Sequence, residues 1–201
     1  MRCIFGADRL DSGALYVRVK PVEIKSPRQA IALGIALVTE DRKTQGLVLE
    51  ASIAGNTTLA NLKAVTDRGF INRKKENEVA RDYIRQLKTK APGEGTSCMT
   101  LSGGNQQKVV LAKWLYTQAD ILILDEPTRG IDVGAKYEIY QLIHKFVGEG
   151  KSVIMISSEM PEVLNMSDRV IVIHEGNQKG ELTKEEMTAE NVMKLAILTE
   201  E

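Results

Sequence analysis

A Ser-Gly-Gly turn stands directly before a helical pattern near the middle of the 201-residue chain. The turn is Ser102-Gly103-Gly104. The apolar residues Val110 and Trp114 lie one helical turn apart after it, which predicts a helix. Small residues at a helix start let backbone N–H groups approach an anion, and the helix dipole favours negative charge there. The turn is therefore compatible with an anion-binding helix N-terminus, although a turn of this kind by itself is more often a simple helix cap.

Two carboxylates follow a short apolar run further along the chain. The run Ile121–Leu124 consists only of branched aliphatic residues and leads directly into Asp125 and Glu126. Such a run predicts a buried parallel strand that delivers both acids to the carboxyl edge of a sheet, where α/β proteins bind ligands. Taken alone, the two acids are also compatible with a helix cap and its neighbour.

Together and in this order, the two stretches resemble the nucleotide-binding domain of ABC transporters. Ser102-Gly103-Gly104 corresponds to the signature motif of that family, Ile121–Glu126 to its Walker B strand and following glutamate, and Asp132 to its D-loop. Within this family, the sequence most resembles the second, C-terminal ATPase half of bacterial sugar-importer subunits of the ribose and galactose type. This closer resemblance depends on three further stretches: Asn105–Lys108, Thr128–Lys136 and Ser157–Glu162. The resemblance covers nearly the whole chain.

The resemblance implies that two such domains pair head to tail, with each ATP between the P-loop of one and the signature of the other. Ser102 then donates its hydroxyl to the γ-phosphate in the partner half's site, and the N–H groups of Gly103 and Gly104 offset the phosphate charge. In the site of this half, Asp125 holds Mg²⁺ through water and Glu126 orients or deprotonates the attacking water. The other residues implied at the ATP sites are Glu40, Asn105, Asp132 (which also ties the halves together) and Ser158.

Two of these positions depart from the family pattern. Glu40 stands where the Q-loop usually carries a glutamine, and Ser158 stands where a histidine usually contacts the γ-phosphate. A carboxylate changes both charge and hydrogen bonding at the first position, and a serine cannot supply the role of an imidazole at the second. Glu40 is also compatible with an ordinary surface-loop acid. We therefore expect weak hydrolysis at the site built on this half.

No segment of the sequence has the G-x-x-x-x-G-K-[ST] pattern of a P-loop. Gly150-Lys151-Ser152 comes nearest, but Lys145 stands where the first glycine is required, and the segment precedes a strand instead of following one. We interpret it as a turn. Met1–Gly6 match the family residues immediately after the P-loop, so the resemblance implies that the chain starts inside the P-loop helix and is a fragment of a larger subunit.

Hydrophobic periodicity and turn signals predict the elements that position these residues. Alternating strands and helices from Ile121 onward indicate an α/β fold with a parallel sheet. Helices are expected at 1–7, 28–33, 47–62, 72–87, 135–146 and 161–166, and after a capping-box spacing at 183–186. With the resemblance, this predicts a partial ABC-type P-loop NTPase domain over residues 1–201. It contains a small antiparallel β region and a helical subdomain at about 47–115 that docks onto membrane subunits.

Composition argues against several classes of function. The 27 basic and 27 acidic side chains balance, so a general attraction to nucleic acid or anionic lipid is not expected. The two cysteines, Cys3 and Cys98, suit a reducing cytosol. No apolar run approaches the roughly 20 residues that cross a bilayer, and no signal-peptide pattern opens the chain, so we expect any membrane role to come through a partner.

The resemblance implies an ATP-binding subunit of an ABC importer for sugars on the cytoplasmic face of the bacterial inner membrane. Its partners are then a second ATP-binding half-domain, the transmembrane permease subunits and, indirectly, a periplasmic sugar-binding protein, with no nucleic acid. The altered Glu40 and Ser158 leave open a non-catalytic regulatory half that completes the partner half's ATP site, and Glu126 argues against it. A non-transport ABC ATPase of DNA repair or translation requires a coiled-coil insertion or a basic surface, and the sequence shows neither.

Overall fold

The computed structural model describes residues 1–197, which form two compact units. The first unit is Met1–Ile156, and the second begins at Ser157. Each unit is built around its own strands, and the predicted anion-binding turn and carboxylates all belong to the first.

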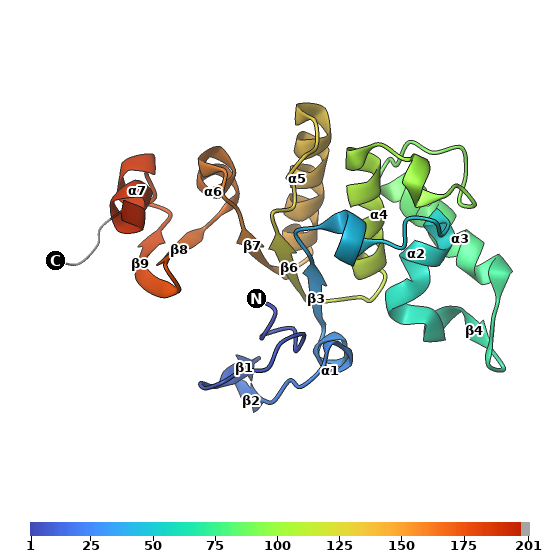
Figure 1. Ribbon diagram of the computed structural model, residues 1–201, viewed down its shortest axis with the longest axis horizontal. Coiled ribbons are helices and arrows are strands. Elements are labelled where there is room, and N and C mark those ends of the chain that lie inside the picture. The colour runs from blue at the N-terminus through green and yellow to red at the C-terminus, as the bar shows by residue number, and fades with distance from the viewer. Residues whose placement is uncertain (198–201) are drawn as a thin grey trace. The chain divides into compact units, whose positions relative to one another are not determined.

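A parallel sheet of three strands lies at the centre of the first unit (Figure 1). Its strands are β3 (Ile35–Val38), β6 (Ile121–Asp125) and β7 (Ser152–Ile156), and β6 lies in the middle. Val38 pairs with Leu124, so the carboxyl ends of neighbouring strands meet at one edge. The predicted parallel sheet is thus confirmed, and it delivers the loops after β3 and β6 to the same place.

The N-terminal segment covers one face of this sheet. It contains the antiparallel hairpin of β1 (Leu15–Val17) and β2 (Lys20–Val22) and the helix α1 (Pro27–Ala32), which confirms the small antiparallel region. Side chains alternate between the faces of a strand, and one face of the sheet joins the N-terminal segment in a single apolar cluster. The buried members of that cluster are Phe5, Ile24, Ala30, Ile35, Leu37 and Ile123.

The expected helix at 1–7 is wrong, because these residues form consecutive turns. The N–H of Gly6 bonds to the carbonyl of Cys3, and the N–H of Ala7 bonds to that of Arg2. Gly6 has a φ of +69°, and a Cβ there would lie 2.7 Å from the backbone nitrogen of Ser26. The left-handed turn thus brings the chain close against the start of α1, which a regular helix could not do.

Helices dominate the segment between β3 and β6. They are the π-helical turn η1 (Arg42–Gly46), α2 (Ile53–Thr58), the 3-10 helix η2 (Leu59–Val65), α3 (Arg73–Gln86), the 3-10 turn η3 (Cys98–Thr100) and α4 (Gly103–Leu115). A short hairpin of β4 (Thr66–Asp67) and β5 (Phe70–Ile71) lies among them. The helix expected over 47–62 begins only at Ile53. The buried Asn56 side chain explains the delay, because it bonds both the N–H (2.8 Å) and the carbonyl (2.9 Å) of Val48 and so holds the preceding residues in a loop.

Helix α5 (Val133–Gly148) completes the first unit and packs beside α4 (Figure 1). The second unit contains α6 (Met160–Met166), the hairpin β8 (Arg169–His174) and β9 (Asn177–Thr183), and α7 (Ala189–Ile197). Strand β9 was not expected, because its sequence is mostly polar. The carboxylate of Glu186 accepts from the N–H of Thr183 (3.0 Å) as the capping-box spacing predicts, but α7 begins later, after Thr188.

Within the described part of the chain, no helix combines the length and the hydropathy needed to cross a bilayer.

Candidate functional site

The two predicted carboxylates end β6 and open a tight turn. Asp125 is the last residue of the strand and is half-buried. Burial raises the pKa of its carboxyl, the neighbouring charge of Glu126 raises it further, and the N-terminal amino group acts in the opposite direction. Glu126 has a φ of +47°, a left-handed conformation that costs a non-glycine residue about 1–3 kcal/mol and often marks a functional site.

Backbone hydrogen bonds hold Glu126 in that conformation. Its N–H donates to the carbonyl of Ile156 on β7 (3.0 Å), and its carbonyl accepts from the N–H of Arg129 (3.1 Å). The strand end and the next loop thus fix the backbone of Glu126 from both sides.

The Ser-Gly-Gly turn starts α4 as the sequence predicts. Ser102 is exposed, and its carbonyl accepts the first helical bond from the N–H of Gln106 (2.9 Å). Its hydroxyl oxygen accepts from the side-chain amide of Asn105 (2.9 Å), which leaves the O–H free to donate elsewhere. The amide oxygen of Asn105 in turn accepts from the N–H of Lys90 (2.8 Å). In this structure, Asn105 therefore orients the Ser102 hydroxyl.

Both glycines of the turn lie against the segment that follows β6. A Cβ on Gly104 would lie 2.6 Å from the Cβ of Ala135, and one on Gly103 would lie 3.2 Å from the carbonyl oxygen of Gly130. Asp132 caps α5, because its carboxylate accepts from the N–H of Ala135 (2.9 Å). The structure thus brings the exposed Ser102 and Asp132 to one region, because Gly103 and the buried Gly104 pack too closely on the following segment for any larger residue.

The remaining two predicted residues, Glu40 and Ser158, belong to other segments of the chain. Glu40 follows β3 and forms an ion pair with the guanidinium of Arg129. Ser158 belongs to the second unit, where it is exposed. The next residue, Glu159, donates its N–H to the hydroxyl oxygen of Ser157 (3.0 Å).

The sequence analysis did not predict the roles of two cations, one beside the Ser-Gly-Gly turn and one in the last turn of α4. The guanidinium of Arg42 donates to the carbonyl of Arg129 (2.9 Å), and the ammonium of Lys113 donates to the carbonyl of Gly46 (2.5 Å). Lys113 stands on α4 and is only 6% exposed. Its contact spans 67 residues of sequence, so no local pattern predicts it; a lysine inside an apolar helix face is the one signal the sequence offers.

Lys113 provides a pH-dependent prediction, because burial lowers its pKa to about 8. The unfolded chain keeps a lysine pKa of about 10.4, so between these values the unfolded state binds more protons and stability rises with pH. The cost of the buried charge is therefore fully present below about pH 8 and is relieved as the pH approaches about 10.4. In urea denaturation, we expect the unfolding free energy of the wild type relative to Lys113→Met to gain up to about 3 kcal/mol from pH 7 to 10.5.

The control for this prediction is Lys145→Met, since Lys145 is exposed on α5. The difference in unfolding free energy between the wild type and Lys145→Met should stay constant over the same pH range. A constant difference for Lys113→Met as well would show that the ammonium is not buried in solution.

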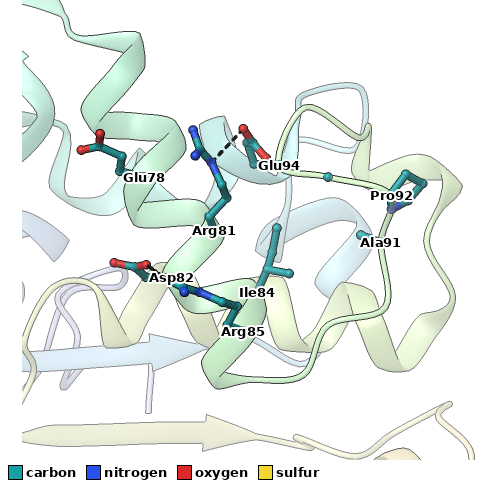
Figure 2. Close-up of a pocket in the computed structure, with 9 residues that line it drawn as sticks. Glu78, Arg81, Asp82, Ile84, Arg85, Ala91, Pro92 and Glu94 are labelled. Atoms are coloured by element: carbon teal, nitrogen blue, oxygen red, sulfur yellow. Dashed lines mark hydrogen bonds and ion pairs between the residues drawn. The ribbon is translucent and has the colours of Figure 1, made fainter.

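A groove of about 620 Å³ lies in the helical region, between α3 and the loop before the signature turn (Figure 2). Arg81 on α3 bonds to Glu94 on the loop (3.1 Å), and Arg85 pairs with Asp82 along the helix. Figure 2 shows these charged side chains at the groove together with the apolar Ile84 and Pro92. The groove contains none of the predicted ATP-site residues.

Comparison with protein families and curated proteins identifies close sequence relatives. A family model described as ABC transporter matches residues 1–129. The ribose import ATP-binding protein of Geobacillus kaustophilus is 51% identical over 98% of this chain and 40% of its own length. The corresponding protein of Bacillus subtilis is 48% identical over 98% of this chain and 40% of its own length. The chain thus spans about two fifths of the length of these relatives.

Solved structures of lower sequence identity share the fold. A nucleotide-free ATP-binding cassette from an ABC transporter superposes with a TM-score of 0.79 at 20% identity, over 96% of this chain and 77% of that one. The dimeric post-hydrolysis state of the cassette MJ0796, bound to ADP and Pi, gives a TM-score of 0.74 at 18% identity, over 91% of this chain and 78% of that one. The α/β fold with its parallel sheet is thus that of an ABC-type P-loop NTPase domain.

Proposed function

The chain belongs to the ABC transporter family, and from this membership we propose that it is the second ATP-binding half of a bacterial sugar-importer subunit. The similarity to ribose import ATP-binding proteins supports a sugar as the transported substrate. The geometric observation that carries the proposal is the packing of Gly103 and Gly104 against Gly130 and Ala135, which forms one exposed surface from the signature turn and the Asp132 turn.

We assign this surface to the ATP held by a second half-domain. The Ser102 hydroxyl donates to the γ-phosphate, and the N–H groups at the start of α4 offset its charge. Asp132 contacts the opposite half. The two halves close when ATP lies between them and open after hydrolysis, which moves the permease between its two orientations.

The carboxylates after β6 serve the ATP site of this half. Among residues 1–197, no cluster of three or more His, Cys, Asp or Glu side chains is arranged to hold a metal ion. Mg²⁺ usually needs only one or two carboxylates together with substrate phosphates, and Asp125 is a donor of this kind. When bound, Mg²⁺ offsets charge on the phosphate oxygens. Glu126 orients the attacking water and accepts its proton, and its fixed left-handed backbone aims the carboxylate.

One observation favours the alternative of a non-catalytic regulatory half. The carboxylate of Glu40, at the Q-loop position, is engaged by Arg129. Together with Ser158 at the histidine position, this pairing weakens the site of this half while leaving the signature surface intact for the partner half. On this reading the chain acts by completing the site of the other half.

We further propose that the subunit lies on the cytoplasmic face of the inner membrane, against permease subunits that receive sugar from a periplasmic binding protein. The helical region at about 47–115 faces the permease, with the charged groove beside α3 as its contact surface. The test is ATP-dependent uptake of ribose into proteoliposomes that contain the full-length subunit and its permease. ATP hydrolysis without ATP-dependent sugar uptake would contradict the transport assignment.

The 201-residue chain alone should bind Mg-ATP only weakly, with a Kd above about 1 mM, and should hydrolyse none measurably. No segment of it has the P-loop pattern whose backbone N–H groups and lysine supply most phosphate contacts. Calorimetric titration measures the affinity directly. Binding in the low micromolar range would mean that the nucleotide site lies elsewhere on the chain.

A further inference from the structure

We propose that Arg42 and Glu40 are positioning residues, which clamp the loop after β3 to the loop after β6 and so fix the surface that meets the partner half's ATP. This inference rests on the proposed function, because that function assigns the surface to ATP. The two residues act through backbone groups of Arg129 and Gly130 and through the guanidinium of Arg129.

The turn that carries Arg42 is itself anchored to the signature helix. It is the π-helical turn η1 (Arg42–Gly46), and the carboxylate of Asp41 caps its start by accepting from the N–H of Lys43 (2.8 Å). At its end, the carbonyl of Gly46 accepts from the buried ammonium of Lys113 on α4 (2.5 Å). A Cβ on Gly46 would lie 3.1 Å from the side chain of Val110, so the turn also packs directly on α4.

From this anchored turn, the Arg42 guanidinium reaches across to the loop after β6. Its Nη1 donates to the carbonyl of Arg129 (2.9 Å), and its Nη2 donates to the carbonyl of Gly130 (3.4 Å). Within the described residues, its buried Nε has no hydrogen-bond partner, so the two Nη groups alone make its hydrogen bonds. A planar fork that binds two successive carbonyls fixes direction as well as distance.

The same guanidinium lies against the signature turn. A Cβ on Gly103 would be 2.8 Å from the Arg42 Nη2 and 3.2 Å from the carbonyl oxygen of Gly130. Gly103 is thus held between the Arg42 side chain and the loop that it binds. The clamp therefore sets the spacing between the start of α4 and the segment that leads to Asp132.

Glu40 makes the clamp reciprocal. Its carboxylate pairs with the guanidinium of Arg129, while the carbonyl of Arg129 accepts from Arg42. Both residues of the loop after β3 thus contact Arg129: Glu40 pairs with its side chain, and Arg42 donates to its carbonyl oxygen. Both side chains of the Glu40–Arg129 pair are at least half exposed, so their attraction adds little stability, and we assign the pair a geometric role.

The test uses the full-length subunit with its permease and three variants. Arg42→Ala removes the fork, Arg42→Lys keeps the charge without the fork, and Lys43→Gln removes an exposed charge from the same turn as the matched control. We expect both Arg42 variants to lower kcat for ATP at least about tenfold with KM changed less than about twofold, because positioning errors act mainly on the reacting geometry. Lys43→Gln should stay within about twofold of the wild type in both constants.

A second readout does not depend on ATP turnover. In hydrogen exchange of the nucleotide-free protein, Arg42→Ala and Arg42→Lys should raise amide exchange about tenfold at Gln106 and Ala135, whose N–H groups are hydrogen-bonded in the wild type. The strands β3 and β6 should be unchanged, as evidence of folding. A double variant that swaps the pair, Glu40→Arg with Arg129→Glu, should exchange more slowly at Ala135 than either single variant. Unchanged exchange in Arg42→Ala, or wild-type kcat and exchange in Arg42→Lys, would overturn the clamp. A wild-type protein without ATPase activity would refute the proposed function instead, while exchange would still test the clamp.

Discussion

Replacing Gly103 with aspartate is expected to lower the ATPase activity of the full-length subunit at least about 100-fold, a loss comparable to removing an oxyanion donor. The new carboxylate would stand at the N-terminus of α4, where the proposed γ-phosphate binds, and like charges repel there. Its Cβ would also press on the Arg42 guanidinium at 2.8 Å and on the Gly130 carbonyl at 3.2 Å. Steady-state ATP hydrolysis, with unfolding curves to confirm the fold, measures the effect.

Glu126→Gln should cost less than about tenfold in the same assay. Under the proposed function, it acts on the site of this half, where Glu40 replaces the family's glutamine, whereas Gly103→Asp acts on the site of the partner half. The control is Gly95→Asp, because Gly95 is exposed and a Cβ there meets no atom within 4 Å. The reverse ranking, with Glu126→Gln abolishing turnover and Gly103→Asp retaining it, would refute the asymmetry between the two sites.

A single methyl group at Gly104 should destabilise the first unit by about 1–3 kcal/mol, as overpacking of a tight contact does. The Cβ of Gly104→Ala would lie 2.6 Å from that of Ala135, so the start of α4 must move away from the start of α5. Gly148→Ala is the matched control, because Gly148 is also helical and a Cβ there meets no atom within 4 Å.

The control should be neutral or stabilising by up to about 1 kcal/mol, since alanine favours the helix. Urea denaturation followed by circular dichroism gives both values. Equal effects at the two positions would mean that α4 and α5 do not meet as closely in solution as the structure shows.

The sequence predicted the central strand β6, the signature helix and the parallel sheet because these depend on local periodicity. Ile35–Val38 and Ile121–Leu124 are continuous aliphatic runs, and burial on both faces requires such runs. The helix expected over 47–62 starts later than predicted because of a side-chain contact. The side chain of Asn56 bonds to the backbone of Val48, and hydrophobic periodicity cannot predict such a bond.

The residues of the candidate site also fall into those that local sequence predicts and those that depend on distant contacts. Ser102, Asp125 and Glu126 were predicted because a turn or a strand end places them. Arg42 was not, since its partners lie 87 and 88 residues away and are backbone carbonyls that any residue provides. The left-handed backbone conformation of Glu126 could not be predicted from the sequence either, because the hydrogen bond of Glu126 to Ile156 depends on the pairing of β6 with β7.

In the proposed function, the signature surface of this chain contacts the ATP held by a second half-domain. The most direct measurement is photolabelling of the full-length subunit with an ATP analogue that carries a photoreactive group on its γ-phosphate, followed by mass spectrometric mapping. The label is predicted on 102–105, and it should disappear when the P-loop of the other half is altered. Absence of label from 102–105, or labelling there that survives the loss of that P-loop, would contradict the account.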